Sequence, residues 1–151
     1  MEEKIQLSQE MLMKAVLANT TSATKISKIL CDHSEDKILK ADEIILGLIY
    51  RLMTPMTDEE MIQSINEAES VLYAESSSDE DSEEENIIDY TDDTDDLSIS
   101  RKIKCNTCNC DICMRCRICL SNFNEYIPKD NLGDLFKNSI LETCKTHNRI
   151  L

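Results

Sequence analysis

The stretch "KCNTCNCDICMRCRICL", residues 104–120, decides the fold, because it crowds six of the chain's eight cysteines into fifteen residues. We find no secretory signal in residues 1–30, and the longest apolar run, residues 44–50, is too short to span a membrane. We therefore expect a soluble intracellular protein, cytoplasmic or nuclear, with no membrane association. In a reducing compartment, such a cluster predicts metal ligands rather than disulfides.

The cysteines are spaced in pairs that suit tetrahedral zinc, because a C-x2-C turn delivers two thiolates from one knuckle. After 24 further residues the chain adds Cys144 and His147, which one face of a helix can present together. Eight ligands fill two four-coordinate zinc sites and leave no open position for a catalytic water. We therefore predict two structural zinc ions and no catalytic residue. The predicted ligands are Cys105, Cys108, Cys110, Cys113, Cys116, Cys119, Cys144 and His147.

Spacing alone leaves the pairing of these ligands open. We favour an interleaved arrangement, in which the first and third C-x2-C pairs of the run bind one ion and the second pair binds the other with Cys144 and His147. In the alternative, the third pair closes on Cys144 and His147. Cys31 and His33 lie far upstream. We interpret Cys31 as a buried, small apolar side chain at a helix end, and we count neither residue among the ligands.

The stretch "CRICL", residues 116–120, followed by Phe123 and a C-terminal pair of ligands, resembles parts of a RING finger. RING proteins are mostly ubiquitin ligases, in which an isoleucine between the first two ligands contacts the conjugating enzyme. The resemblance implies that role for Ile118, with Leu120 beside it, in a rearranged RING-like or treble-clef module. A ubiquitin ligase component is therefore one alternative function.

The last four cysteines of the run also resemble the C-x2-C-x2-C-x3-C-P ligands of bacterial ferredoxins. The third spacing is one residue shorter here and Leu120 replaces the proline, so we prefer zinc to an iron–sulfur cluster. Arg115 and Arg117 flank the knuckles, where they offset thiolate charge or contact a partner. A nucleic-acid-binding finger is the second alternative, and the net charge of −14 and the 4% aromatic content disfavour it.

Residues 1–73 predict a small helical bundle, because apolar residues recur at helical spacing over residues 11–16, 23–30, 38–52 and 61–72. We expect Ser34 to cap the third of these helices and Thr57 to open the fourth through a capping box. Residues 132–144 predict a further helix, which carries Cys144 toward the knuckles. About seventy residues make a thin core, so we expect the N-terminal helices to bind a protein partner or to self-associate.

The central segment separates these two parts by its charge. Residues 74–100 hold 12 acids and no base, which predicts a disordered acidic linker. In contrast, residues 1–73 have 13 acids and 7 bases, and residues 101–151 have 5 acids and 9 bases. Four serines beside linker acids are candidate phosphorylation sites: Ser76, Ser77, Ser78 and Ser82.

The sequence thus predicts a mainly α protein with three parts. Residues 1–73 form a helical interaction domain, residues 74–100 an acidic disordered linker, and residues 101–151 a cysteine-rich zinc-binding module with one helix. We expect a non-enzymatic adaptor or regulatory protein that joins one protein partner at the helices to a second at the zinc module, with transcription as a candidate process. The Lys-, Ile-, Asn-, Asp- and Glu-rich composition suits an AT-rich genome, such as that of a large DNA virus.

Overall fold

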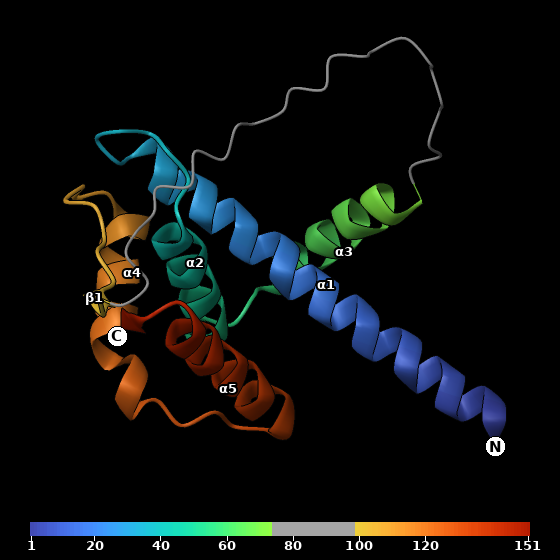
Figure 1. Ribbon diagram of the computed structural model, residues 1–151. Coiled ribbons are helices and arrows are strands. Elements are labelled where there is room, and N and C mark those ends of the chain that lie inside the picture. The colour runs from blue at the N-terminus through green and yellow to red at the C-terminus, as the bar shows by residue number, and fades with distance from the viewer. Residues whose placement is uncertain (74–98) are drawn as a thin grey trace, which may run out of the picture.

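A computed structural model describes residues 1–73 and 99–151 of the chain (Figure 1). The described residues are mainly helical, which confirms the predicted fold class. In chain order the elements are α1 (Glu2–Asp32), α2 (Ala41–Met53), α3 (Asp58–Leu72), β1 (Arg101–Lys102), α4 (Asp111–Asn122), the 3-10 helix η1 (Phe123–Glu125), α5 (Asn131–Thr146) and β2 (Arg149–Ile150). The four candidate phosphoserines lie outside the described residues. Within the described ranges, no helix has both the length and the apolar character that a membrane span requires.

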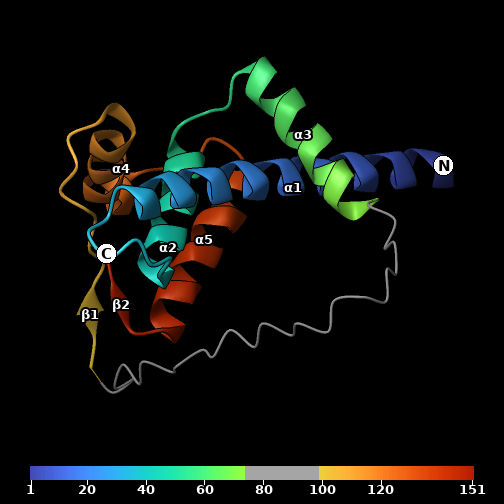
Figure 2. The same ribbon diagram turned by 90° about the horizontal axis from the view of Figure 1, so that it is seen from above.

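The first two predicted helical stretches form one long helix, α1, which packs against both α2 and α3 (Figures 1 and 2). At its crossing with α2 the two backbones approach closely. A Cβ on Gly47 would lie 2.2 Å from the Ser27 hydroxyl oxygen and 2.5 Å from the Ala23 carbonyl oxygen. Glycine at position 47 is therefore what allows α2 to lie against this face of α1.

The two predicted helix starts have different outcomes. The capping box at Thr57 is confirmed: the Glu60 amide donates to the Thr57 hydroxyl at 3.2 Å, and the Glu60 carboxylate accepts from the Thr57 amide at 2.9 Å. The predicted cap at Ser34 is wrong, because α2 begins at Ala41. The Ser34 hydroxyl donates to the Cys31 carbonyl at 2.7 Å and accepts from the Lys37 amide at 3.2 Å, within a turn in which Lys37 has a positive φ of 51°.

The C-terminal elements share a core with the N-terminal helices, because α2 packs against α4 and α5 as well as against α1. Phe123 is the largest of the fully buried side chains in the described residues. One cluster of buried residues includes Ile26, Leu30, Ile45, Leu46, Ile49, Tyr50, Ile103, Cys113, Cys116, Phe123, Ile140 and Cys144. The end of α1 and the beginning of α4 are thereby held on the same side of α2.

A buried carboxylate joins α2 to the short parallel pair of strands β1 and β2. Asp42, in the first turn of α2, is 3% exposed. One of its oxygens lies 3.3 Å from Arg149 Nε and 3.4 Å from Arg101 Nη2, and the other accepts from the Lys104 amide at 3.2 Å. Asp42 therefore fixes the backbone that leads directly into the cysteine run.

Candidate metal centre

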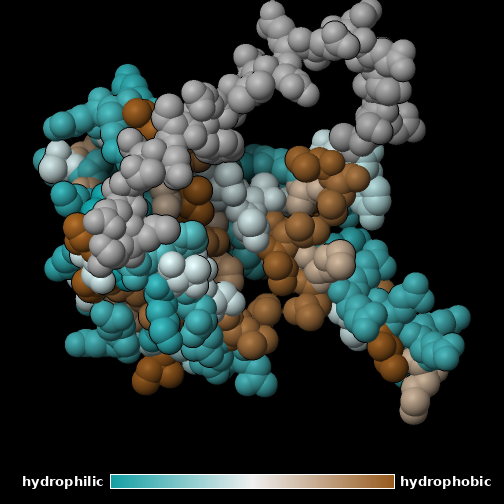
Figure 3. Space-filling view, in the orientation of Figure 1, coloured by the Kyte–Doolittle hydropathy of each residue, from teal (hydrophilic) through white to brown (hydrophobic). Residues whose placement is uncertain are grey.

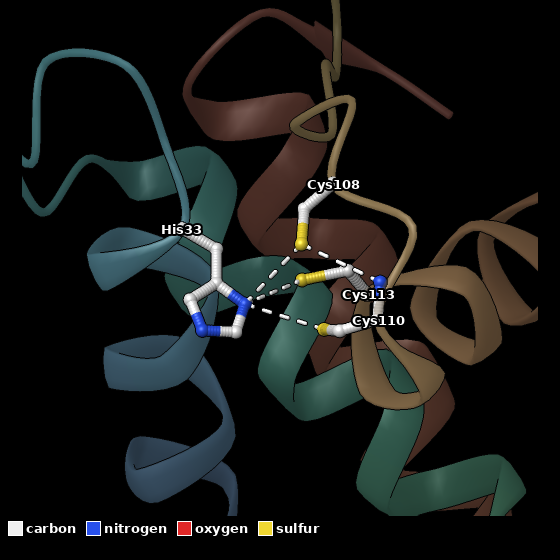
Figure 4. Close-up of side chains that lie close together, drawn as sticks. All are labelled: His33, Cys108, Cys110 and Cys113. Atoms are coloured by element: carbon white, nitrogen blue, oxygen red, sulfur yellow. Dashed lines mark hydrogen bonds between the residues drawn. The ribbon is translucent and has the colours of Figure 1, made fainter.

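Three cysteines of the run meet a histidine from the end of α1 (Figure 4). His33 Nδ1 lies 3.5 Å from Cys108 Sγ, 3.2 Å from Cys110 Sγ and 3.4 Å from Cys113 Sγ. All four ligand atoms lie within 4.8 Å of one another, and the four side chains point toward a common centre. This group is the candidate metal centre.

The elements around the centre explain how each ligand is placed. His33 is the C-cap residue of α1: its backbone N–H donates to the Ile29 carbonyl, and the N–H of the next residue, Ser34, donates to the Cys31 carbonyl. Cys108 lies in the loop after β1, Cys110 is the N-cap residue of α4, and Cys113 lies in the first turn of that helix. The centre thus lies between the C-terminal end of α1 and the N-terminal end of α4.

Asn106 holds the loop of residues 103–110, called here the knuckle loop, against α1. This role was not predicted from the sequence. Its side-chain amide donates to the Leu30 carbonyl at 3.0 Å and contacts Cys113 Sγ at 3.4 Å. Its side-chain oxygen accepts from the Cys108 amide at 3.2 Å. Arg117 supports the same loop from α4, because its Nη1 donates to the Asn106 carbonyl at 2.8 Å. The loop is therefore positioned by hydrogen bonds as well as by the ligands.

The charges at the centre favour a thiolate at Cys110. The backbone N–H of Cys113 lowers the pKa of Cys110 to about 6, with further contributions from the Cys113 and Cys108 thiols and from His33. An N-cap thiolate is also stabilised by the helix dipole. In contrast, burial raises the pKa of Cys113 to about 12. Without a cation the group therefore carries its negative charge first at Cys110, and a divalent cation favours ionisation of the other thiols.

We expect Cys110 to be the most reactive thiol of the metal-free protein. Its alkylation by iodoacetamide should stay near its maximal rate at pH 7, because the thiolate is protonated only as the pH falls through about 6. Peptide mapping by mass spectrometry across pH 5–8 measures this rate for each cysteine. Added Zn²⁺ should protect Cys110, and modification spread evenly over the run would contradict the expectation.

The geometry of the group fits zinc. Zn–S bonds of about 2.3 Å and Zn–N bonds of about 2.0–2.1 Å at tetrahedral angles place nitrogen and sulfur about 3.5 Å apart. The three N···S distances of 3.2, 3.4 and 3.5 Å are close to that value. Three thiolates and one imidazole are also a ligand set that structural zinc sites commonly use. The side chains present can therefore hold one zinc ion with little movement.

The other predicted ligands lie elsewhere. Cys116 and Cys119 follow Cys113 at intervals of about one turn on α4, and Cys119 Sγ lies 4.0 Å from the Thr54 hydroxyl. Burial, followed by the nearby Cys105 and Cys119 thiols, raises the pKa of Cys116 to about 12. Cys144 is buried in the core, and His147 is the exposed C-cap residue of α5. In the described ranges, none of these five residues joins a group of three or more ligand atoms within 4.8 Å.

His33 is not among the eight metal ligands predicted from the sequence. The predicted set supplies the three cysteines of the centre, but the fourth ligand comes from a residue 75 positions before Cys108. The sequence signal that could have found it is the placement of one of only two histidines at the end of a predicted helix. No local motif connects that histidine to the cysteines, because the connection is made by the packing of α4 on α2.

The residues predicted to contact a partner all lie on α4. Ile118 is exposed on its surface, and Leu120 is half-buried against the core. The Arg115 side chain is exposed and forms an ion pair with Asp111 at 3.3 Å. Arg117 is half-buried, as its bond to the knuckle loop requires. Ile118 and Arg115 are thus the more accessible members of this predicted surface.

Similarity to other proteins adds nothing to this geometry. Comparisons of the chain with models of known families, with curated proteins and with solved structures found no match. The RING-like and ferredoxin-like resemblances therefore rest on the cysteine run and its neighbours alone. What supports a function is the group of His33 with three cysteines, which points to a zinc-binding protein.

Proposed function

We propose that the protein is a non-enzymatic, zinc-dependent interaction protein, in which a structural zinc ion joins the end of α1 to the cysteine-rich segment. The observation that carries the proposal is the group of His33, Cys108, Cys110 and Cys113, in which the three N···S distances are close to those of tetrahedral zinc. Four protein ligands fill the tetrahedron and leave no position for an activated water. The ligand set therefore supports a structural rather than a hydrolytic role.

The position of the ion supports this role. It holds together residues 75 or more positions apart in the chain, so metal binding supplies free energy that closes a long loop. The knuckle loop from residue 103 to residue 110 contains no helix or strand of its own. Its backbone order thus depends on the ligands, on Asn106 and on Asp42. The ion completes the surface where α4 meets the end of α1.

The apolar surface supports the adaptor part of the proposal. On the C-terminal side Ile118, Ile127 and Leu135 are exposed, and a second set of apolar side chains is exposed on the N-terminal half of α1. Exposed apolar surface of this kind is typical of protein–protein contacts. We propose that these two surfaces engage protein partners and that the zinc centre fixes how the two surfaces are presented.

We also propose a second, weaker zinc site at Cys105, Cys116 and Cys119, as the number of thiols in the run suggests; these three sulfur atoms do not lie within 4.8 Å of one another, so they would have to move together to bind an ion. Cys116 and Cys119 are one turn apart on α4, and the Cys105 thiol lies near enough to raise the pKa of Cys116. The affinity should be lower than at the candidate metal centre, because three thiolates leave one position to be filled from solution.

The metal content of the purified full-length chain, measured by elemental mass spectrometry with an absorption spectrum, tests the function. We expect one tightly held zinc ion, a second that dialysis removes, and no visible absorption. A strong chelator should lower the Tm by at least about 10 °C, because lost metal binding is lost folding energy. Iron with a visible band would support an iron–sulfur protein instead. A Tm that does not respond to the chelator would overturn the structural role.

A further inference from the structure

The face of α1 that packs on α2 continues along the helix beyond α2. Its positions alternate in steps of four and three residues: Ile5, Gln9, Leu12, Val16, Asn19, Ala23, Ile26 and Leu30. This alternation is the spacing of a coiled-coil seam. From Ala23 to Leu30 the seam is covered, since Ala23, Ile26 and Leu30 are buried and Ala23 meets Gly47 of α2.

The N-terminal half of the same seam is bare. Ile5, Leu12 and Val16 are 55%, 52% and 45% exposed. Figures 1 and 2 show that this half of α1 projects past α2 and α5, while α3 lies along a different side of the helix. The contacts of α3 use that other side, where Lys14 and Lys25 pair with Glu69 and Glu67. The N-terminal half of this seam therefore continues the contact between α1 and α2, but no helix of residues 1–73 and 99–151 packs against it.

A pocket lies where the bare seam reaches the body of the protein. It encloses about 170 Å³ and is lined by Val16 and Asn19 of α1, Arg51 and Leu52 of α2, and Asp130, Leu132, Gly133 and Phe136 at the start of α5. Figure 3 shows apolar side chains gathered around the point where α1 leaves the body. The pocket is of the size and apolar character that suit one branched aliphatic side chain.

We propose that the bare seam binds the same seam of a second copy of the chain, with the two α1 helices antiparallel. In the register where Ile5 of each helix meets Val16 of the other, Leu12 meets Gln9. Each of the four seam positions from 5 to 16 then has a seam position opposite it. This register places Ile5 of the second copy at the mouth of the pocket beside Val16. By two-fold symmetry the first copy fills the second pocket in the same way.

The charges of α1 favour this orientation. Glu2, Glu3 and Lys4 lie at the start of the helix, whereas residues 15–24 carry no charged side chain. An antiparallel pair brings the charged start of one helix against the neutral stretch of the other. A parallel pair would place Glu2 and Glu3 beside their own counterparts, which is unfavourable.

The size of the contact sets the expected affinity. The overlap from residue 2 to residue 19 is about 27 Å long at the rise of an α-helix. A contact between two helices of that length, together with the pocket residues at the start of α5, buries an area at the small end of specific interfaces, below about 1,200 Å² in total. We therefore expect a reversible dimer with a Kd of about 1–10 μM.

Sedimentation equilibrium of the zinc-loaded, reduced full chain from below 1 μM to about 200 μM tests the proposal. Wild-type protein should shift from monomer to dimer over this range. Leu12→Asp should raise the Kd at least tenfold, because it places a carboxylate in the centre of the seam twice. Ile5→Asp should have a similar effect through the pocket. Both residues are exposed in the monomer, so the far-UV circular dichroism should not change.

Leu7→Asp is the matched control. Leu7 is 59% exposed on the same half of α1, but it lies outside the seam. Its substitution should leave the Kd within about twofold of wild type. A wild-type chain that stays monomeric throughout, or equal weakening by Leu7→Asp and Leu12→Asp, would overturn the proposal. A partner of another sequence on this seam would appear as the first of these outcomes.

Discussion

His33→Ala should remove tightly bound zinc, whereas His147→Ala should leave it in place. The chain has two histidines, each within three residues of a cysteine, and among the described residues only His33 lies in a group of candidate ligands. The loss of one of four ligands from the centre should weaken zinc binding more than the 10- to 100-fold typical of an outer-shell change, so we expect about 100-fold or more. Competition with a chromogenic chelator measures the affinity, and thermal unfolding should show a parallel fall in Tm.

The pair of variants separates the observed geometry from the interleaved arrangement that spacing favoured. His147 is exposed at the end of α5, so its removal should cost little stability in any case. His33 is also exposed, so a large effect of its removal must come through the metal. If His147→Ala released zinc and His33→Ala did not, the candidate metal centre would be wrong and Cys144 would be the next residue to test.

Asp42→Ala should destabilise the fold by about 3–5 kcal/mol, because it removes a buried carboxylate that pairs with Arg149 and Arg101. The Asp42 side chain is 4% exposed, and the Arg149 side chain, 3.3 Å away, is 12% exposed. The substitution also removes the acceptor of the Lys104 amide, which leads into the cysteine run. Urea unfolding of the reduced, zinc-loaded chain measures the change in the free energy of unfolding.

Asp58→Ala provides the comparison for Asp42→Ala. Asp58 is likewise an aspartate in the first turn of a helix, but it is exposed. Its removal should cost about 0.3–1 kcal/mol through the helix dipole alone. Similar losses for the two variants would mean that the buried ion pairs of Asp42 contribute nothing beyond a helix-end effect. A loss of zinc affinity in Asp42→Ala would further show that β1 positions the knuckle loop.

Local signals in the sequence predicted the fold well where the structure is local. The Thr57 capping box is confirmed because its two hydrogen bonds involve residues three apart. Ser34 carried a similar signal, and its hydroxyl does accept from the Lys37 amide at 3.2 Å while it donates to the Cys31 carbonyl at 2.7 Å. No helix follows at this point, because Lys37 has a positive φ of 51° and the chain turns there. A cap-type hydrogen bond to the residue three positions further on therefore does not by itself show that a helix begins.

The cysteine run shows a different limit. An interval of three residues suits both a C-x2-C knuckle and one face of an α-helix, so the same spacing predicts two structures. In the structure, Cys110 begins α4, and Cys113, Cys116 and Cys119 lie along it. The three ligands of the centre could be named from the sequence as part of a larger set. His33 could not, since its distance from the cysteines is set by the core around α2.

The candidate metal centre takes its ligands from both sides of the central acidic segment, so distant parts of the sequence are linked in evolution. His33 precedes that segment and the three cysteines follow it. A substitution at His33 changes the selective pressure on three codons far downstream, and the reverse also holds. The four ligands of the centre lie outside the segment between them, so we expect that segment to tolerate changes in length and composition. We therefore expect the two regions that hold these ligands to evolve as one unit around a variable middle.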